Sequence, residues 1–377
     1  MNLMRDKKQS QFAVLLAVWA LLLVGLTLWH LDNKKALEQR FIESHTAMVL
    51  KPKQLAVEDL FNTLYENLRI ISLLPSVRNI SGDNRHSESE SVISEGRFTP
   101  EGKQTVQQIY NNLRENVNVS EVYAVLKGLD ASKGQIPFFM FDTMVFGSAH
   151  PTAPPPHDAD YPEESEAAEY SYFPQQLQAI QQAHPRFVFT QAGQIPAYAS
   201  PIMRTCDNAQ YLSKIHGNER ESFGLLYSVP FYDAATEQFK GVIAGIVRSN
   251  VFEAALVGEP MVPVTEQDLA NQKAQGWDMP PPSRFAMSNA GYMVRIQDRR
   301  SKDLQTQLEQ GQEGRNTFHI TLDIHSDKPW VLHYYLPEDM IKAATADSDR
   351  RFYILLTVLM LMLVLAWRNR NGSELKD

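Results

Sequence analysis

The sequence has one cysteine among its 377 residues, so no disulfide bond can form within the chain. Positive charge is also scarce, because 36 Lys and Arg residues stand against 44 Asp and Glu, giving a formal net charge of −8. A negative chain without a basic tract in its middle is unsuited to nucleic acid. We therefore expect no nucleic-acid partner, and a fold that depends on its hydrophobic core.

The motifs of common enzymes are missing as well. The chain contains no Gly-x4-Gly-Lys-Ser/Thr phosphate loop, no His-Glu-x2-His zinc helix and no Gly-x-Ser-x-Gly nucleophile turn. His150, His157, Asp158 and Asp160 are irregularly spaced near prolines, which does not predict a fixed metal site, and Cys206 has no recognisable histidine partner in the sequence. We expect no enzymatic activity, no metal and no cofactor.

Two long apolar stretches bracket the chain. Residues 12–29 carry no charge and, as a helix, are long enough to cross about 30 Å of hydrocarbon. Residues 352–367 form a shorter stretch with arginines on both sides that can reach the two interfaces. We predict transmembrane helices at residues 12–31 and 352–367, followed by a short tail at residues 368–377.

Each stretch also has an alternative interpretation. The first could be a cleaved signal peptide, since basic residues precede it, but no small-x-small cleavage site comes before the polar run at residues 32–40. The second could be a buried core helix. Residues 1–11 contain three basic residues and one acidic residue, which favours a cytoplasmic N-terminus. We therefore expect both termini in the cytoplasm and the main domain on the other side of the membrane.

The residues between the stretches exceed the usual size of one hydrophobic core, so two modules are expected. Apolar residues recur at steps of three and four over residues 57–74, which predicts a long amphipathic helix emerging from the membrane. Further patterns predict helices near residues 100–115 and 175–183, and strands at residues 119–126, 136–146, 223–232, 239–248, 292–297, 317–324 and 330–336.

Two irregular regions interrupt these elements. A proline-rich break at residues 257–282 is predicted to link a membrane-distal part, residues 32–256, to a membrane-proximal module, residues 283–349. Residues 150–169 are rich in proline and acid, and no Lys or Arg occurs over residues 134–185. We expect an exposed loop or lid at residues 150–169, as a solvated acidic insertion or, alternatively, a cation site.

Together these features resemble the double Cache family of bacterial extracytoplasmic sensors. The resemblance covers residues 34–349 and rests on the helix end LYENLRIISLLPSVRNI, the strand pair VYAVL and PFFMFD, the hairpin GLLYSVPFYDAATEQFKGVIAGIV and the closing strand WVLHYYLPEDMI. The hairpin is the most specific, because its Asp-containing turn and its Phe-x-Gly-Val are similar to the family's pattern. The resemblance implies an α+β fold: a long N-terminal helix with two tandem PAS-like (Cache) antiparallel-sheet modules, flanked by two transmembrane helices.

In this family the membrane-distal module holds a small ligand over its sheet. Amine-binding members use Arg-x-Trp-Tyr and an Asp at the end of the hairpin, whereas the nearest counterparts here are Tyr170-Ser171-Tyr172-Phe173 and Ile246. A desolvated ammonium group needs an anionic or aromatic partner, and the strongest such partner is missing. The comparison with the family's motif therefore implies an anionic or neutral ligand rather than an amino acid.

The predicted ligand-binding residues are aromatic or basic: Tyr123, Phe139, Phe141, Tyr172, Tyr198, Arg204 and Tyr227. Arg204 is suited to clamp a carboxylate through two parallel hydrogen bonds, or it could pair with Asp207 in a structural turn. The aromatic residues equally fit an ordinary core.

The sequence thus predicts a sensor of the bacterial inner membrane whose periplasmic double Cache domain binds a small ligand and passes a signal across the bilayer. The family resemblance also implies a homodimer. Only residues 368–377 follow the second span, so we expect the output module in a longer protein or in a separate signalling partner. The alternative functions are a membrane-anchored envelope scaffold whose Cache-like modules bind protein, and an unrecognised hydrolase.

Overall fold

The computed structural model describes residues 2–87, 89–117, 119–142, 164–204, 223–248, 251–252, 255–256, 285–289, 292–294 and 316–374. The chain divides into two compact units, one formed by Met1–Lys51 with Leu336–Asp377 and the other by Pro52–Tyr335. Helices and antiparallel sheets give the α+β fold that the sequence predicts. The predicted linker at residues 257–282 lies outside the described residues, as do Cys206 and Asp207.

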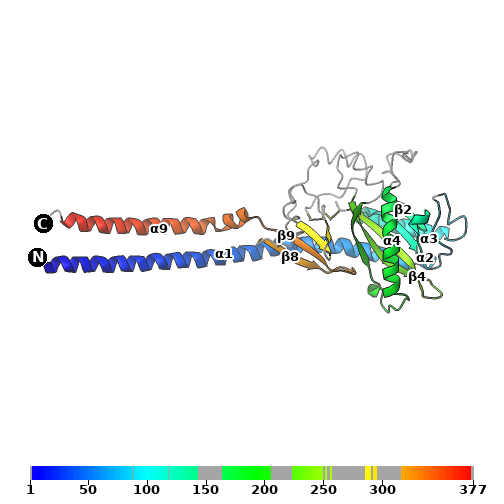
Figure 1. The fold of residues 1–377 in the computed structure, drawn as a ribbon, viewed down its shortest axis with the longest axis horizontal. Coiled ribbons are helices and arrows are strands. Elements are labelled where there is room, and N and C mark those ends of the chain that lie inside the picture. Colours follow the sequence, from blue (N-terminus) through cyan, green and yellow to red (C-terminus); the bar gives the residue numbers. More distant parts are fainter. Residues whose placement is uncertain are drawn as a thin grey trace. The chain divides into compact units, whose positions relative to one another are not determined.

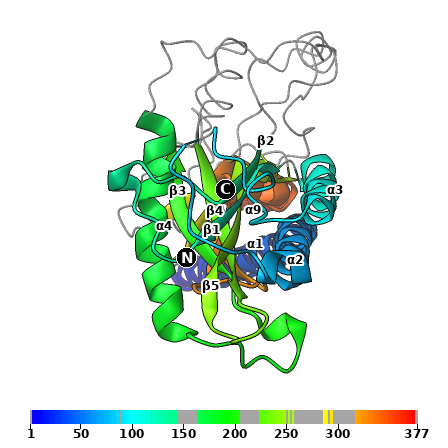
Figure 2. The same cartoon turned by 90° about the vertical axis from the view of Figure 1, so that its right-hand side faces the viewer.

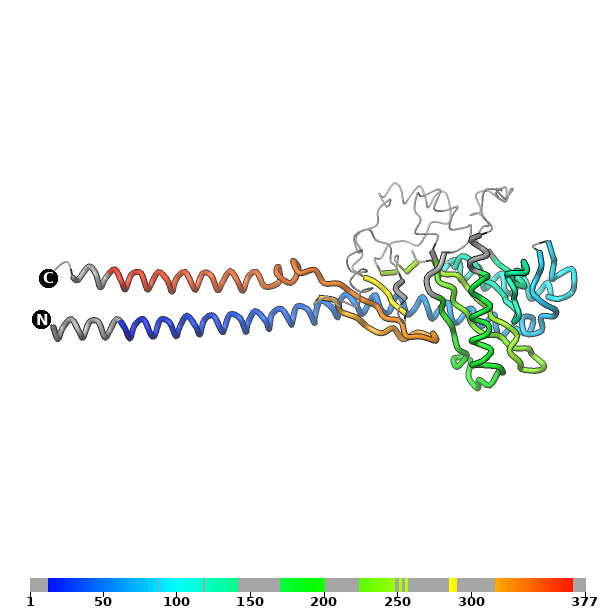
Figure 3. Tube along the Cα trace, in the orientation of Figure 1, coloured from blue at the N-terminus to red at the C-terminus, as the bar shows by residue number. Residues whose placement is uncertain are grey.

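The first unit contains the N-terminal part of α1 (Asn2–Leu73) and most of α9 (Glu338–Glu374). The two helices lie side by side (Figures 1 and 3), and Trp19 Nε1 donates to the carbonyl oxygen of Leu359 at 3.2 Å. By length and composition, both are apolar enough to cross a membrane. Their apolar side chains face outward, as at Leu21, which is 72 % exposed. Both predicted apolar helices are therefore present, and α1 continues without a break beyond its apolar part.

Polar contacts join the same two helices beyond their apolar segments. Lys34 Nζ lies 2.8 Å from one carboxylate oxygen of Asp349 and 3.0 Å from the other, and His30 Nε2 lies 3.1 Å from Asp349 Oδ1. The hydrogen bond from Lys34 lowers the pKa of Asp349, so this carboxylate is charged at neutral pH. The contacts fix the two helices against each other at this level.

The second unit holds a five-stranded antiparallel sheet with the order β2-β1-β5-β4-β3. Its strands are β1 (Val119–Leu126), β2 (Phe139–Asp142), β3 (Tyr198–Arg204), β4 (Phe223–Tyr232) and β5 (Phe239–Arg248). The predicted hairpin is confirmed, because β4 and β5 begin and end at the residues that the pattern indicated. One face of the sheet is covered by α4 (Glu164–Ala183), and the other faces α1, α2 (Pro75–Arg78) and α3 (Pro100–Val117) (Figure 2).

The start of α4 corrects one prediction. Residues 150–169 were expected to form an exposed loop, yet the helix begins at Glu164, so residues 164–169 are helical. Glutamate and alanine are good helix formers, and acidic residues near a helix N-terminus interact favourably with its dipole. Of the same region, residues 143–163 lie outside the described part of the chain.

The turn between β4 and β5 is organised by Asp233. Its Oδ1 accepts hydrogen bonds from the amides of Ala235 and Thr236 at 3.0 and 2.9 Å, and its Oδ2 lies 2.8 Å from Lys240 Nζ. The hydrogen bonds from Lys240 and the Thr236 amide hold the pKa of Asp233 well below its usual range. The carboxylate form is thus favoured by the folded hairpin.

The Asp233→Asn variant should therefore lose stability in a pH-dependent way. A carboxyl whose pKa is lower in the folded state contributes stability above its unfolded pKa of about 3.9, and this contribution is lost as the pH falls through the folded pKa. We expect the thermal midpoint of the variant to lie below that of the wild type at pH 7, and the difference to shrink below about pH 4. Asp83→Asn, at an exposed carboxylate, is the control. A difference that is constant from pH 7 to 2 would contradict the assigned role.

A second, four-stranded antiparallel sheet has the order β7-β6-β9-β8. Its strands are β6 (Phe285–Asn289), β7 (Tyr292–Val294), β8 (Thr317–Leu322) and β9 (Trp330–Tyr335). The sequence predicted the last three of these, whereas β6 was missed, because it follows closely on the proline-rich break. Trp330, Leu332 and Tyr334 are buried on one face of β9 and form the core of this sheet.

Candidate ligand-binding site

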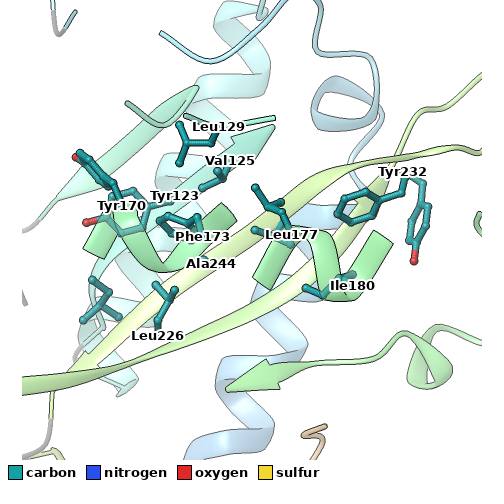
Figure 4. Packing of buried hydrophobic residues seen from close by; sticks show 13 residues of the cluster. Tyr123, Val125, Leu129, Tyr170, Phe173, Leu177, Ile180, Leu226, Tyr232 and Ala244 are labelled. Carbon is teal, nitrogen blue, oxygen red and sulfur yellow. The ribbon is translucent and has the colours of Figure 1, made fainter. Parts of the chain in front are cut away.

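The face of the five-stranded sheet beneath α4 carries a cluster of buried side chains (Figure 4). The cluster combines Phe173, Leu177 and Ile180 of α4 with residues of β1, β4 and β5. Cross-strand pairing aligns one row across all five strands, composed of Met140, Tyr123, Ala244, Ser228 and Tyr198. The small side chains of Ala244 and Ser228 thus lie in the middle of this row, between two tyrosines.

A polar pair is buried within this apolar surrounding. Gln176 of α4 is 5 % exposed, and its Oε1 accepts a hydrogen bond from the Ser228 hydroxyl of β4 at 2.7 Å. Gln176 Nε2 is also buried, and no residue that the structure describes accepts a hydrogen bond from it. A buried amide without a partner costs about 1–3 kcal/mol. The Gln176 amide is therefore a donor available for an acceptor group on a ligand.

A buried glutamate side chain belongs to the same sheet. Glu121 of β1 is 1 % exposed, lies two residues before Tyr123 and accepts a hydrogen bond from the Ser120 hydroxyl at 3.0 Å. Residues two apart on a strand share a face, which places Glu121 on the side of Tyr123. The sequence did not single out Glu121, Gln176 or Ser228. The one available signal was a glutamate in a strand of mostly apolar residues, because Glu is almost never fully buried unless it has a partner.

The predicted ligand-binding residues divide between the two faces of the sheet. Tyr123 belongs to the cluster beneath α4, and Tyr172 and Tyr198 pack against it. Arg204 ends β3, where its backbone pairs with Phe223, and its side chain lies outside the described part of the structure. Tyr123, Tyr172 and Tyr198 are therefore on the α4 face, whereas the cross-strand partner of Arg204, Phe223, alternates along β4 with Tyr227 rather than with Ser228.

The other three residues lie on the opposite face. Phe139 and Phe141 of β2 pair with Ala124 and Val122, and their rings lie 5.3 Å from Phe98 and 6.1 Å from Tyr110 respectively. The ring of Tyr227 lies 5.8 Å from that of Phe61 on α1. A small ligand beneath α4 cannot reach these three side chains, whose packing corresponds to the core role that the sequence left open.

The tyrosine hydroxyls of the α4 face are suited to donate hydrogen bonds. Burial raises the pKa of Tyr198, so its phenol stays protonated at neutral pH. Burial likewise raises the pKa of Tyr232, whose hydroxyl has no hydrogen-bond partner among the residues that the structure describes. Within that part of the chain, no group of three His, Cys, Asp or Glu residues is placed to hold a metal ion. His150, His157, Asp158 and Asp160, whose spacing did not predict a metal site, lie outside it.

No protein-family model matches the chain, and no curated protein sequence matches it either. Several solved structures do match. The extracellular domain of the putative histidine kinase soHK1S-Z6 is 13 % identical, with 83 % of this chain and 99 % of that domain covered at a TM-score of 0.39. The periplasmic sensory domain of the Campylobacter jejuni chemoreceptor Tlp1 is 10 % identical, with 80 % and 98 % covered at a TM-score of 0.41. The sensory domain of the C. jejuni chemoreceptor Tlp3 with isoleucine bound is 12 % identical, with 82 % and 97 % covered at a TM-score of 0.36.

Proposed function

We propose that this chain is a sensor of a bacterial inner membrane, which binds a small molecule on the α4 face of its five-stranded sheet. The observation that carries the proposal is the buried Gln176 amide, whose Nε2 has no acceptor among the described residues. Protein cores normally provide a hydrogen-bond acceptor for a buried amide donor, so a donor without an acceptor is a reason to look for a ligand. The two apolar helices and the tandem antiparallel sheets support the proposal.

The proposed arrangement in the membrane follows the sequence. Residues 12–31 and 352–367 cross the bilayer, both termini lie in the cytoplasm, and residues 32–349 lie in the periplasm. In this proposal the distal module, within residues 32–256, binds the ligand, while the proximal module, residues 283–349, connects it to the second span. Two copies form a homodimer, and a separate signalling partner or a further part of the protein receives the signal.

The residues of the α4 face favour a class of ligand. Gln176 Nε2 requires an acceptor, such as a carbonyl oxygen, a carboxylate or an aromatic ring nitrogen. The surroundings of Gln176 on this face are otherwise largely apolar, which disfavours a charged ligand. We therefore place a neutral polar molecule first, bound at the cluster to which Tyr123, Tyr172 and Tyr198 belong. An anionic ligand is the second choice.

Thermal unfolding of the purified chain in detergent, measured against a panel of nucleobases, amides, carboxylates, amines and amino acids, tests the proposal. A compound at 100 times its dissociation constant stabilises the folded state by about 2.7 kcal/mol, which gives a clear shift of the midpoint. A reproducible shift identifies the ligand class. If no compound shifts the midpoint of a cooperatively unfolding protein, the sensor proposal is contradicted and a protein-binding scaffold is favoured.

The Gln176→Met variant should abolish the ligand-induced shift. Methionine keeps an unbranched side chain of similar length in the cluster but removes the amide donor, and loss of one buried hydrogen bond weakens binding by about tenfold. Gln178→Met is the matched control, since this glutamine is exposed on the same helix. The affinity of the compound found in the panel, measured by calorimetry, should fall for Gln176→Met alone. Equal affinities for the two variants would remove Gln176 from the site.

A further inference from the structure

Residues 323–328, in the loop between β8 and β9, touch the helix α1 at two points. The amide of Asp323 donates to the carboxylate of Glu58 at 2.9 Å. The ring of His325 stacks on that of Tyr65, with centroids 3.9 Å apart and planes 7° from parallel. We call this segment the latch loop. Its contacts hold the turn of the four-stranded sheet against α1.

The latch loop is also bonded to the five-stranded sheet. The Tyr227 hydroxyl of β4 donates to the carbonyl oxygen of His325, and the backbone amide of Ala199 on β3 donates to Asp327 Oδ1 at 3.2 Å. Ala199 and Tyr227 are cross-strand partners. The neighbouring strands β3 and β4 are therefore both bonded to the loop, through two residues that lie opposite each other.

The residues next to these anchors belong to the candidate ligand-binding face. Tyr198 precedes Ala199, Ser228 follows Tyr227, and Tyr198 and Ser228 are themselves cross-strand partners. Successive side chains of a strand point to opposite faces, and Ser228 faces α4 through its hydrogen bond to Gln176. The same short stretches of β3 and β4 thus carry the candidate site on one face and the latch loop on the other.

The chain then leads from the loop toward the apolar helices. One residue separates the latch loop from β9, which begins at Trp330 and ends at Tyr335. The helix α9 begins three residues after the end of β9, at Glu338. Its partners Glu58 and Tyr65 belong to α1. The loop is consequently connected to both helices that carry the apolar segments.

We infer that the latch loop couples the α4 face of the five-stranded sheet to the two membrane helices. The inference rests on the proposed sensor function, because the movement to be transmitted is the one that a ligand causes in β3 and β4. Tyr227 is fully buried, so its hydroxyl depends on the loop carbonyl for its hydrogen bond, whereas Asp323, His325 and Asp327 are exposed. A strand displacement that breaks this bond removes one of the contacts that hold a mostly exposed segment, and so loosens it.

Hydrogen exchange of the full chain in lipid nanodiscs tests this coupling without any ligand. We expect the Tyr227→Phe variant to speed exchange of the amides of residues 323–328 by about two- to tenfold, the effect of losing one hydrogen bond. Tyr232→Phe is the matched control, because it removes a hydroxyl of the same strand that has no hydrogen-bond partner among the described residues. Unchanged exchange of the loop in Tyr227→Phe overturns the inference. If that variant does not fold, Asp327→Ala replaces it, with exchange of the Ala199 amide as the readout.

A substitution on the α4 face of the five-stranded sheet tests whether a change there reaches the latch loop on the opposite face. Ser228→Ala removes the hydrogen bond to Gln176, and we expect it to raise exchange of residues 323–328 in the wild-type background but not in Tyr227→Phe. A merely structural role of Tyr227 would give additive effects instead, and additive effects overturn the coupling. The result is independent of the ligand panel. If no compound of the panel shifts the midpoint but the effects of the two substitutions on loop exchange are not additive, only the sensor proposal is contradicted. If a compound binds but these effects are additive, only this inference is contradicted.

Discussion

The Gly241→Ala variant is expected to be among the most destabilising substitutions in the chain, with a loss of about 3 kcal/mol or more. A Cβ at this position would lie 2.0 Å from the carbonyl oxygen of Val125 and 2.8 Å from Cε1 of Phe231. Both neighbours belong to strands that pair with β5 around Gly241. A backbone oxygen cannot rotate away like a side chain, so β1 and β5 must separate. This close approach also gives a physical reason for the glycine of the Phe-x-Gly-Val pattern.

Gly245→Ala is the control for this prediction, because it makes the same change on the same strand. A Cβ at Gly245 would lie 3.4 Å from Val119 Cγ1 and 3.5 Å from the side chain of Leu68, which are ordinary van der Waals contacts. We expect its unfolding midpoint to stay close to that of the wild type. Thermal unfolding followed by circular dichroism compares the two variants. Equal losses would mean that glycine is required along β5 for a reason other than the approach of β1.

Most strand positions were predictable from the sequence because those strands have a local pattern. The hairpin of β4 and β5 combines two apolar runs with an Asp-containing turn, and both runs were assigned to the residue. The strand β6 was missed because Phe285–Asn289 is only five residues long and follows a run of prolines. Its assignment depends on pairing with β9, which no local pattern reveals.

The candidate site was less predictable, because the face to which a strand residue points depends on register. Alternation shows that Phe139 and Phe141 share a face, but only pairing with Ala124 and Val122 places them opposite Tyr123. A shift of the pairing by one residue would have put them on the α4 face. Gln176 was missed for a related reason, since a glutamine among other glutamines on a helix gives no sign of which one is buried.

Phe61→Ala is expected to cost about 3–5 kcal/mol, the usual range for removing a buried phenylalanine ring. Phe61 is fully buried, and its ring lies 5.4 Å from those of Phe252 and Trp330 and 5.8 Å from that of Tyr227. Trp330 belongs to the four-stranded sheet and Tyr227 to the five-stranded one. The ring of one α1 residue therefore fills a space bordered by both sheets.

The expected fall of the thermal midpoint for Phe61→Ala is on the order of 10 °C, measured on the detergent-solubilised chain. Phe61→Leu should lose less, because it keeps part of the buried apolar surface. Leu55→Ala is the second control, since Leu55 is 52 % exposed on the same helix, and such a change costs within about 0.5 kcal/mol. Because Phe61 contacts both sheets, we expect Phe61→Ala to destabilise both of them. Protection of backbone amides from hydrogen exchange should therefore fall in β4 and in β9. A loss of protection confined to β9 would show that the five-stranded sheet does not depend on this ring.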